Sequence, residues 1–338
     1  MNSIHSRTMI RRRSVAGLLA AGALLAAGAG LAADRADAAV SAQVANGTLL
    51  VNGDRDDDRI TLRLQAGVPT TLQVDGDDDG TADARFDRAT FDRIVVNARG
   101  GDDTIRMDEA NGVFTDTEST TVSAGSGDDT FLGGRGNELF FGGPDKDVAD
   151  GNGGSDTGIM GSGHDVFIWD PGDGSDVIEG QSGYDTMDFN GSAGDEIFDA
   201  SANGERLRFF RNAGNITMDT DGVEKVDLDA LGGLDSATVN DLSGTDVKKV
   251  YVDLAAAIGG TAGDGLADSV VVNATPGDDE IDIRPRNGRV AVEGLAAKVV
   301  VANPEAANDS LTVNALGGED EIHLGNGLSG LIRTSVVA

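Results

Sequence analysis

The chain has 338 residues, with 58 Asp and Glu against 26 Lys and Arg, a formal charge of −32, 49 Gly and no Cys. This acidity argues against nucleic acid or an anionic membrane surface as a partner, because phosphates would be repelled. The lack of Cys excludes disulfides, thiolate zinc sites and thiol nucleophiles.

The apolar composition is that of an ordered protein. Leu, Ile, Val and Phe make up about 24% of the chain, above the roughly 20% that marks disordered sequences. These residues fall in short alternating runs bounded by turn residues, a pattern typical of strands. We therefore expect an all-β protein.

Residues 1–38 have the features of a secretory signal peptide. Arg11, Arg12 and Arg13 precede an uncharged stretch rich in Ala and Gly, and Ala36-Asp37-Ala38 supplies the small residues of a cleavage site. A membrane anchor is the alternative, but Ala and Gly make the stretch weakly hydrophobic for a permanent span. We expect cleavage, export by the Sec or the Tat route, and a secreted protein with no membrane span.

Five strand–turn–strand units share one internal spacing, in which a polar residue stands six positions before an Asp. The pairs are Asn52 and Asp58, Asn97 and Asp103, Asp229 and Asp235, Asn273 and Asp279, and Asn314 and Asp320. Consecutive units are separated by 41 to 45 residues, a period typical of solenoids. In these units we favour turn capping by the Asp over metal binding. Residues 39–123 and 191–338 are thus predicted to form β-solenoid-like segments.

An acidic loop in the first segment is a candidate metal site. Asp75, Asp77 and Asp79 with Gly80 match places 1, 3, 5 and 6 of a D-x-D-x-D-G calcium loop, and Asp83 stands at place 9. Place 12, where an EF-hand needs Glu, is Phe86, and strands are expected on both sides. We predict a bound ion at Asp75, Asp77 and Asp79, with a solvated acidic turn as the alternative.

Seven nonapeptides occupy residues 124–188, with Trp169 and Asp170 inserted between the fifth and the sixth. The fourth place is mostly Gly and the eighth mostly apolar, for example Phe131, Phe140 and Phe167. The sixth place always carries a carboxylate, in the order Asp129, Glu138, Asp147, Asp156, Asp165, Asp176 and Asp185. This pattern is typical of a parallel β-roll, in which two nonapeptides form one coil of about 18 residues. The predicted roll spans residues 124–190.

Stacked coils would align the sixth-place carboxylates in two rows, one for each side of the roll. Two such charges about 5 Å apart repel by roughly 3 kcal/mol at an effective dielectric constant of 20, so the rows require cations. Calcium accepts six to eight oxygen ligands, and Gly-rich turns can offer carbonyl oxygens. We therefore predict Ca²⁺ between neighbouring turns, with the binding energy contributing to folding. The replacement of Asp by Glu138, the irregular Pro144-Asp145, and the small Ala149 and Gly158 predict weaker binding in their coils.

This segment resembles the hemolysin-type (RTX) calcium-binding repeats of secreted bacterial proteins. Residues 171–189 resemble the run that closes such a roll, and residues 205–233 are similar to β segments that trail the repeats in bacterial calcium-binding proteins. The resemblance implies a parallel β-roll that holds calcium through the sixth-place Asp residues and turn carbonyls.

Catalytic motifs are missing from the sequence. There is no H-E-x-x-H, no G-x-S-x-G and no G-K-[ST] loop, and His164 falls at an outward place of its nonapeptide. Arg206, Arg208 and Arg211 with Phe209 and Phe210 form a basic and aromatic cluster that we assign to strand packing. We expect a non-enzymatic calcium-binding protein. A structural or adhesive surface protein, and a β-helix polysaccharide lyase or epimerase, are the alternatives.

Overall fold

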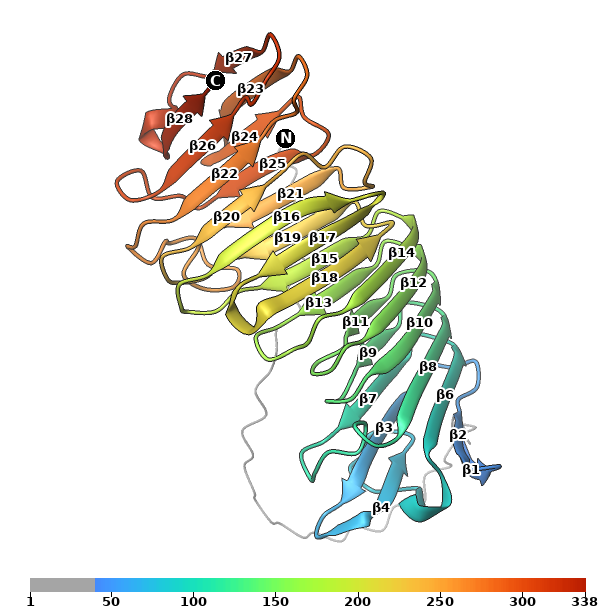
Figure 1. Cartoon of the computed structure of the whole chain (residues 1–338). Helices are drawn as coiled ribbons and strands as arrows, with labels where there is room; N and C mark the ends of the chain where they lie inside the picture. The colour runs from blue at the N-terminus through green and yellow to red at the C-terminus, as the bar shows by residue number, and fades with distance from the viewer. Residues whose placement is uncertain (1–39) are drawn as a thin grey trace, which may run out of the picture. The chain divides into compact units, whose positions relative to one another are not determined.

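The computed structural model describes residues 40–338 and arranges them in two 14-stranded sheets, here called sheet A and sheet B. Successive coils of the chain lie side by side, so strands distant in sequence become neighbours (Figure 1). This arrangement confirms the predicted all-β, largely parallel solenoid. The predicted signal peptide lies outside the described residues. Within residues 40–338, no helix has the length and apolar character needed to cross a membrane.

Sheet A contains, in spatial order, β1 (Ser41–Ala45), β2 (Thr48–Asn52), β6 (Arg93–Gly100), β8 (Ser119–Ser126), β10 (Glu138–Pro144), β12 (Thr157–Gly163), β14 (Val177–Gly183), β18 (Ile216–Asp221), β17 (Arg206–Arg211), β16 (Ile197–Asn203), β20 (Ser236–Val239), β22 (Ser269–Asn273), β26 (Ser310–Asn314) and β28 (Arg333–Val337).

Sheet B contains, in spatial order, β27 (Glu321–Leu324), β23 (Glu280–Arg286), β24 (Arg289–Glu293), β25 (Lys298–Ala302), β21 (Lys249–Asp253), β19 (Lys225–Asp229), β15 (Thr186–Asn190), β13 (Val166–Trp169), β11 (Val148–Asp150), β9 (Thr130–Leu132), β7 (Thr104–Asp108), β3 (Arg59–Gln65), β4 (Val68–Asp75) and β5 (Ala84–Asp87). Three short 3₁₀ helices are η1 (Arg88–Thr90), η2 (Ala213–Asn215) and η3 (Leu328–Gly330).

The nonapeptide coils follow the predicted period. Val148 pairs with Thr130 on one side and with Val166 on the other, in parallel register, so one coil takes 18 residues. Val166 pairs with Thr186, a step of 20 residues, because Trp169 and Asp170 are inserted in that coil. Trp169 is the last residue of β13 and pairs with Phe189, so the insertion is absorbed at the end of this strand without loss of register.

The flanking segments depart from a continuous parallel coil. In four places the chain folds back within one sheet as antiparallel strands, at β1–β2, β3–β4–β5, β16–β17–β18 and β23–β24–β25. The basic and aromatic cluster lies on β17. Phe209 is buried in the core, Arg211 pairs with Glu196, and Arg206 pairs with Asp219, which agrees with a packing role.

The polar residue that defines the five units stacks across coils. Asn97 donates its side-chain amide to Asn52 at 3.2 Å, and Asn314 donates to Asn273 at 2.7 Å. These four residues lie on strands of sheet A, whereas Asp229 ends β19 of sheet B. The third unit is therefore half a coil out of phase with the others, although its internal spacing is the same.

The core fills the space between the two sheets. The apolar eighth-place residues of the nonapeptides are buried, as predicted, and the rings of Phe131 and Phe140 stack with their centroids 5.1 Å apart. Gly158 lacks a side chain because a Cβ there would lie 2.9 Å from the ring of Phe167. The apparent gap in the sequence pattern is thus occupied by a neighbouring aromatic ring.

Adjacent phenylalanines provide a test of this core. Phe140 is 2% exposed, whereas Phe141 points outward and is 37% exposed. We expect Phe140→Ala to lower the free energy of unfolding by about 3–5 kcal/mol, because it opens a cavity beside Phe131. Phe141→Ala should cost less than about 1 kcal/mol. Urea unfolding in millimolar calcium measures both, and equal losses would contradict the inward assignment of position 140.

Candidate metal centre

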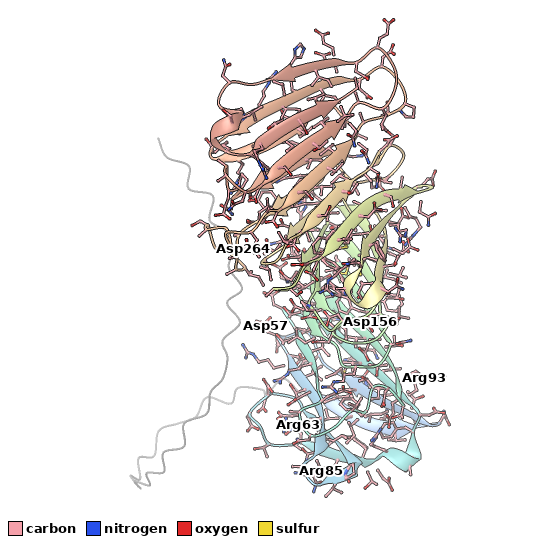
Figure 2. All side chains as sticks on the ribbon, turned by 60° about the vertical axis from the view of Figure 1, so that its left-hand side comes forward. Asp57, Arg63, Arg85, Arg93, Asp156 and Asp264 are labelled. Atoms are coloured by element: carbon pink, nitrogen blue, oxygen red, sulfur yellow. The ribbon has the colours of Figure 1, made fainter. Side chains whose placement is uncertain are left out.

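The seven sixth-place carboxylates stack in two rows at the corners where strands begin. Asp129, Asp147, Asp165 and Asp185 precede strands β9, β11, β13 and β15, and we call this row the sheet B ladder. Glu138, Asp156 and Asp176 stand at the start of β10, β12 and β14 and form the sheet A ladder. All seven are buried, with exposures of 3% or less. Figure 2 locates Asp156 within the middle coils.

One oxygen of each ladder Asp is bound by the backbone of the preceding coil, whereas Glu138 Oε2 accepts the N–H of Gly134 in its own turn at 2.9 Å. The N–H of Asp129 donates to Asp147 Oδ1 at 3.0 Å, and the N–H of Asp147 donates to Asp165 Oδ1 at 2.8 Å. On sheet A the N–H of Glu138 donates to Asp156 Oδ1 at 2.7 Å. These bonds fix each carboxylate at the same height in its coil and hold the like charges in register.

The second oxygen of most ladder carboxylates has no hydrogen-bond partner although it is buried. The atoms concerned are Oδ2 of Asp129, Asp147, Asp156, Asp165 and Asp185, and Oε1 of Glu138. Within residues 40–338, no Lys or Arg forms an ion pair with any of them. A buried carboxylate oxygen without a partner is costly, and the effective penalty for a buried ion is several kcal/mol.

Burial also changes the acidity of these groups. It raises the pKa of Asp147 to about 8 and that of Asp156 to about 9, and the charges of neighbouring ladder residues add to the effect. The backbone hydrogen bonds described above act in the opposite direction but are outweighed. Glu138 and Asp176 reach a pKa of about 7, and Asp129 and Asp185 about 6, again mainly through burial. The protein alone therefore does not stabilise the charged form of the ladders.

The turns beside the ladders are packed too tightly for side chains. At Gly154, which has a φ of 130°, a Cβ would lie 1.8 Å from the carbonyl oxygen of Gly136 in the preceding coil. At Gly142, a Cβ would lie 2.3 Å from Asp147 Oδ2 and 2.4 Å from the carbonyl oxygen of Met160. Backbone carbonyl oxygens and carboxylate oxygens therefore crowd the same corner.

The sheet B ladder is longer than the nonapeptide motif. The N–H of Asp103 donates to Asp129 Oδ1, and the N–H of Asp58 donates to Asp103 Oδ1, each at 2.8 Å. At the other end, Asp185 N–H donates to Glu224 Oε2 at 2.7 Å. The sequence held a signal for Asp103, because Gly101-Asp102-Asp103-Thr104-Ile105 repeats the form of Gly127-Asp128-Asp129-Thr130-Phe131. Asp58 Oδ2 also accepts the N–H of Asp54 in its own turn at 3.0 Å, so the predicted turn capping is present together with membership of this row.

A third row, which we call the C-terminal ladder, lies outside the nonapeptides. Asp235, Asp268 and Asp309 are linked with Glu196 through the same bonds, with N–H to Oδ1 distances of 2.8 to 3.1 Å. This row ends at a buried ion pair between Glu196 and Arg211. A similar buried acid, Glu118 before β8, receives two bonds of 2.7 Å from Arg88. At these two positions the protein supplies its own cation.

The acidic loop forms a different group from the one predicted. Ligand oxygens of Asp75, Asp77 and Asp83 lie within 4.8 Å of one another and could hold a metal ion. Asp79 is not part of this group, because it stands at the exposed tip of the loop and accepts the N–H of Thr81 at 2.6 Å. Antiparallel pairing of β4 with β5 returns Asp83 towards Asp75. Arg63, within the N-terminal coils of Figure 2, pairs with Asp75 at 2.8 Å and supplies part of the compensating charge.

The donor set of the ladders fits a hard divalent cation. Carboxylate oxygens and backbone carbonyls are the ligands that calcium and magnesium accept, and calcium tolerates many oxygens in flexible geometry. The protein is thus a parallel β-solenoid with stacked carboxylate ladders and a separate Asp group able to bind a metal.

Comparisons with known proteins assign no family. No protein-family model matches the chain, and no curated protein matches it. One match among solved structures is the extracellular lipase LipA from Serratia marcescens, with 12% identity, 61% of this chain and 43% of the lipase chain covered, and a TM-score of 0.16. The match thus spans less than half the lipase, and a TM-score this low carries no argument. The resemblance to hemolysin-type repeats stays a prediction from the sequence.

Two glycines allow the cost of backbone strain in the turns to be measured separately from the cost of steric crowding. Gly154 and Gly172 have φ values of 130° and 120°, but a Cβ at Gly172 would meet no atom within 4 Å. Gly172→Ala should cost about 1–2 kcal/mol through backbone strain alone. Gly154→Ala should cost about 1–3 kcal/mol more, because the stacked carbonyl must move. Chemical denaturation in millimolar calcium compares the two variants, and a Gly154→Ala loss no larger than that of Gly172→Ala would contradict the close stacking.

Proposed function

We propose that this chain is a secreted, non-enzymatic calcium-binding protein whose central roll is stabilised by Ca²⁺ on the carboxylate ladders. The observation that carries the proposal is the set of buried ladder oxygens without any protein partner. Such oxygens, held in register beside carbonyl-rich turns, need a cation to balance their charge. The predicted signal peptide supports export to a compartment where calcium can be plentiful.

On this proposal, calcium is held by oxygens from neighbouring turns. Asp129, Asp147, Asp165 and Asp185 would contribute on sheet B, and Glu138, Asp156 and Asp176 on sheet A. The bound ion supplies positive charge and accepts the unpartnered oxygens. The hydrogen bond from the preceding coil keeps each Asp carboxylate oriented, and the turn glycines leave room for carbonyl oxygens to approach.

Calcium binding and folding are then one process. The ladder carboxylates come together only when the coils stack, so calcium binds the folded state and stabilises it by mass action. At low calcium the rows of buried charge oppose folding. The proposed role is therefore calcium-dependent order, with a poorly folded roll inside the cell and a folded one outside.

The basic residues near the roll support a non-enzymatic role. Arg211 is 6% exposed and lies over the Trp169 ring at 5.0 Å besides pairing with Glu196. Arg206 bonds Asp219 at 2.6 Å and Glu179 at 2.9 Å. Both side chains are occupied in packing and ion pairing, so neither arginine is free to act on a substrate.

The proposal is tested on residues 39–338 by calorimetric titration with calcium. We expect heat from several bound ions and a shift of the circular dichroism spectrum from coil towards β structure. Asp147→Asn with Asp165→Asn should weaken calcium binding tenfold or more, a loss of at least about 1.4 kcal/mol, because two buried ligands lose their charge.

Asp128→Asn is the matched control for this titration. Asp128 stands next to Asp129 in the same turn, but it is exposed and accepts the N–H of Lys146 at 3.0 Å. Its replacement should leave calcium affinity close to that of the wild type. Identical spectra in EDTA and millimolar calcium would rule out calcium-dependent order, and equal losses in the two variants would contradict the assignment of the inner carboxylates as ligands.

The raised pKa values predict how the calcium effect varies with pH. Folding raises the pKa of Asp147 and Asp156 to about 8 and 9, from about 3.9 in the unfolded chain. The metal-free fold is therefore favoured at low pH, and it loses stability as the pH rises from the unfolded pKa to the folded pKa. Calcium binds the deprotonated form and should offset that loss. Calorimetry should show a calcium-induced rise in Tm that is several degrees larger at pH 8.5 than at pH 5. A calcium-induced rise in Tm that is equal or larger at pH 5 would contradict this pH dependence.

A further inference from the structure

We propose that Asp58 and Asp103, which lie outside the nonapeptides, form an additional divalent-cation site in the N-terminal coils. The inference extends the proposed function to a segment that lacks the nonapeptide motif. It assigns ligand roles to two residues that the sequence pattern alone favours as turn caps.

The geometry at these positions repeats that of the sheet B ladder. Asp58 and Asp103 are each 1% exposed. Asp103 Oδ1 accepts the N–H of Asp58, while Asp103 Oδ2 is buried without a hydrogen-bond partner. Asp58 Oδ2 accepts the N–H of Asp54 at 3.0 Å, while Asp58 Oδ1 is buried without one. Each carboxylate thus keeps one oxygen for the backbone and leaves the other unpartnered.

The turns around this pair have the same crowding by oxygen atoms. At Gly53 a Cβ would lie 2.2 Å from Asp58 Oδ2 and 2.7 Å from the carbonyl oxygen of Ala98. At Gly101, which has a φ of 109°, a Cβ would lie 2.5 Å from the carbonyl oxygen of Asp56. Carbonyl and carboxylate oxygens from both coils therefore meet at this corner, and they are the ligands of a hard cation.

The protein provides no cation of its own here. Buried Glu118 and Glu196 are each neutralised by an arginine, Arg88 and Arg211 respectively. Within residues 40–338, no Lys or Arg forms an ion pair with Asp58 or Asp103, although arginines such as Arg55 and Arg59 are close in sequence. Burial raises the pKa of Asp103 to about 7, and the charges of Asp129 and Asp58 add to this shift. An external cation would satisfy both carboxylates.

The same two turns contain a matched pair of exposed acids. Asp57 and Asp102 precede the inner pair by one residue and point outward, and Figure 2 locates Asp57 on the N-terminal coils. Asp57 Oδ1 accepts the N–H of Asp102 at 2.8 Å, and Asp102 Oδ1 accepts the N–H of Asp128 at 2.9 Å. They carry the same charge in the same turns, but their remaining oxygens face water.

The experiment counts calcium ions bound to residues 39–338 by native mass spectrometry and maps hydrogen exchange with and without calcium. We expect Asp58→Asn with Asp103→Asn to bind at least one ion fewer than the wild type. Calcium-dependent protection should fall tenfold or more in β3 and β7 and persist in β11 and β13. Asp57→Asn with Asp102→Asn should match the wild type in both measurements.

An unchanged ion count in the inner variant, or equal losses in the inner and outer variants, overturns the inference. A second measurement leaves the site itself intact. In the chain with Asp147→Asn and Asp165→Asn, calcium should still slow hydrogen exchange in β3 and β7. If calcium does not slow exchange there, the inference is overturned, even if the Asp58→Asn, Asp103→Asn variant does not fold. If only the Asp147→Asn, Asp165→Asn variant loses calcium binding, this inference is wrong but the proposed function stands. If the wild type binds no calcium, the proposed function is wrong as well.

Discussion

Rows of buried, like-charged carboxylates are the constraint on which this structure depends. Strand stacking fixes the spacing between coils, and a hydrogen bond from each coil to the next fixes the height of the ladder Asp carboxylates. The acids cannot separate without breaking the β-solenoid. The repulsion between them therefore belongs to the fold itself, and whatever neutralises the ladders decides how stable the stacked coils are.

The backbone and the ladders support each other. The ladder N–H groups lie at turns, where sheet hydrogen bonding ends, and the carboxylate of the next coil satisfies them. The glycine turns bring carbonyl oxygens to the same corner because nothing larger fits at positions such as Gly154. Inside the roll, the stacked Phe131 and Phe140 rings supply apolar burial that does not depend on ions. The apolar interior of the fold thus favours stacking of the coils, whereas the charged corners oppose stacking until cations bind.

The central coils could be predicted from the sequence because the sixth-place carboxylate and the eighth-place apolar residue mark the register of every nonapeptide. The 18-residue step, the inward eighth place and the two carboxylate rows are all found in the structure. The antiparallel excursions at β4 and β17 were not predicted, since alternating strands look alike whichever neighbour they pair with. The phase of the unit at Asp229 was hidden for a related reason. A local spacing does not say on which sheet the unit starts.

Buried acids are neutralised in two different ways in different parts of the molecule. Where an arginine is within reach, as at Glu118 and Glu196, the positive charge is covalently part of the chain and present in any medium. Where the chain offers only oxygen, as along Asp129 to Asp185, the charge must come from solution and varies with the concentration of cations. Because Arg211 also covers the Trp169 ring, it closes the aromatic end of the roll independently of ions. Dependence on cations is therefore set residue by residue, by whether a buried carboxylate meets a guanidinium or only oxygen atoms.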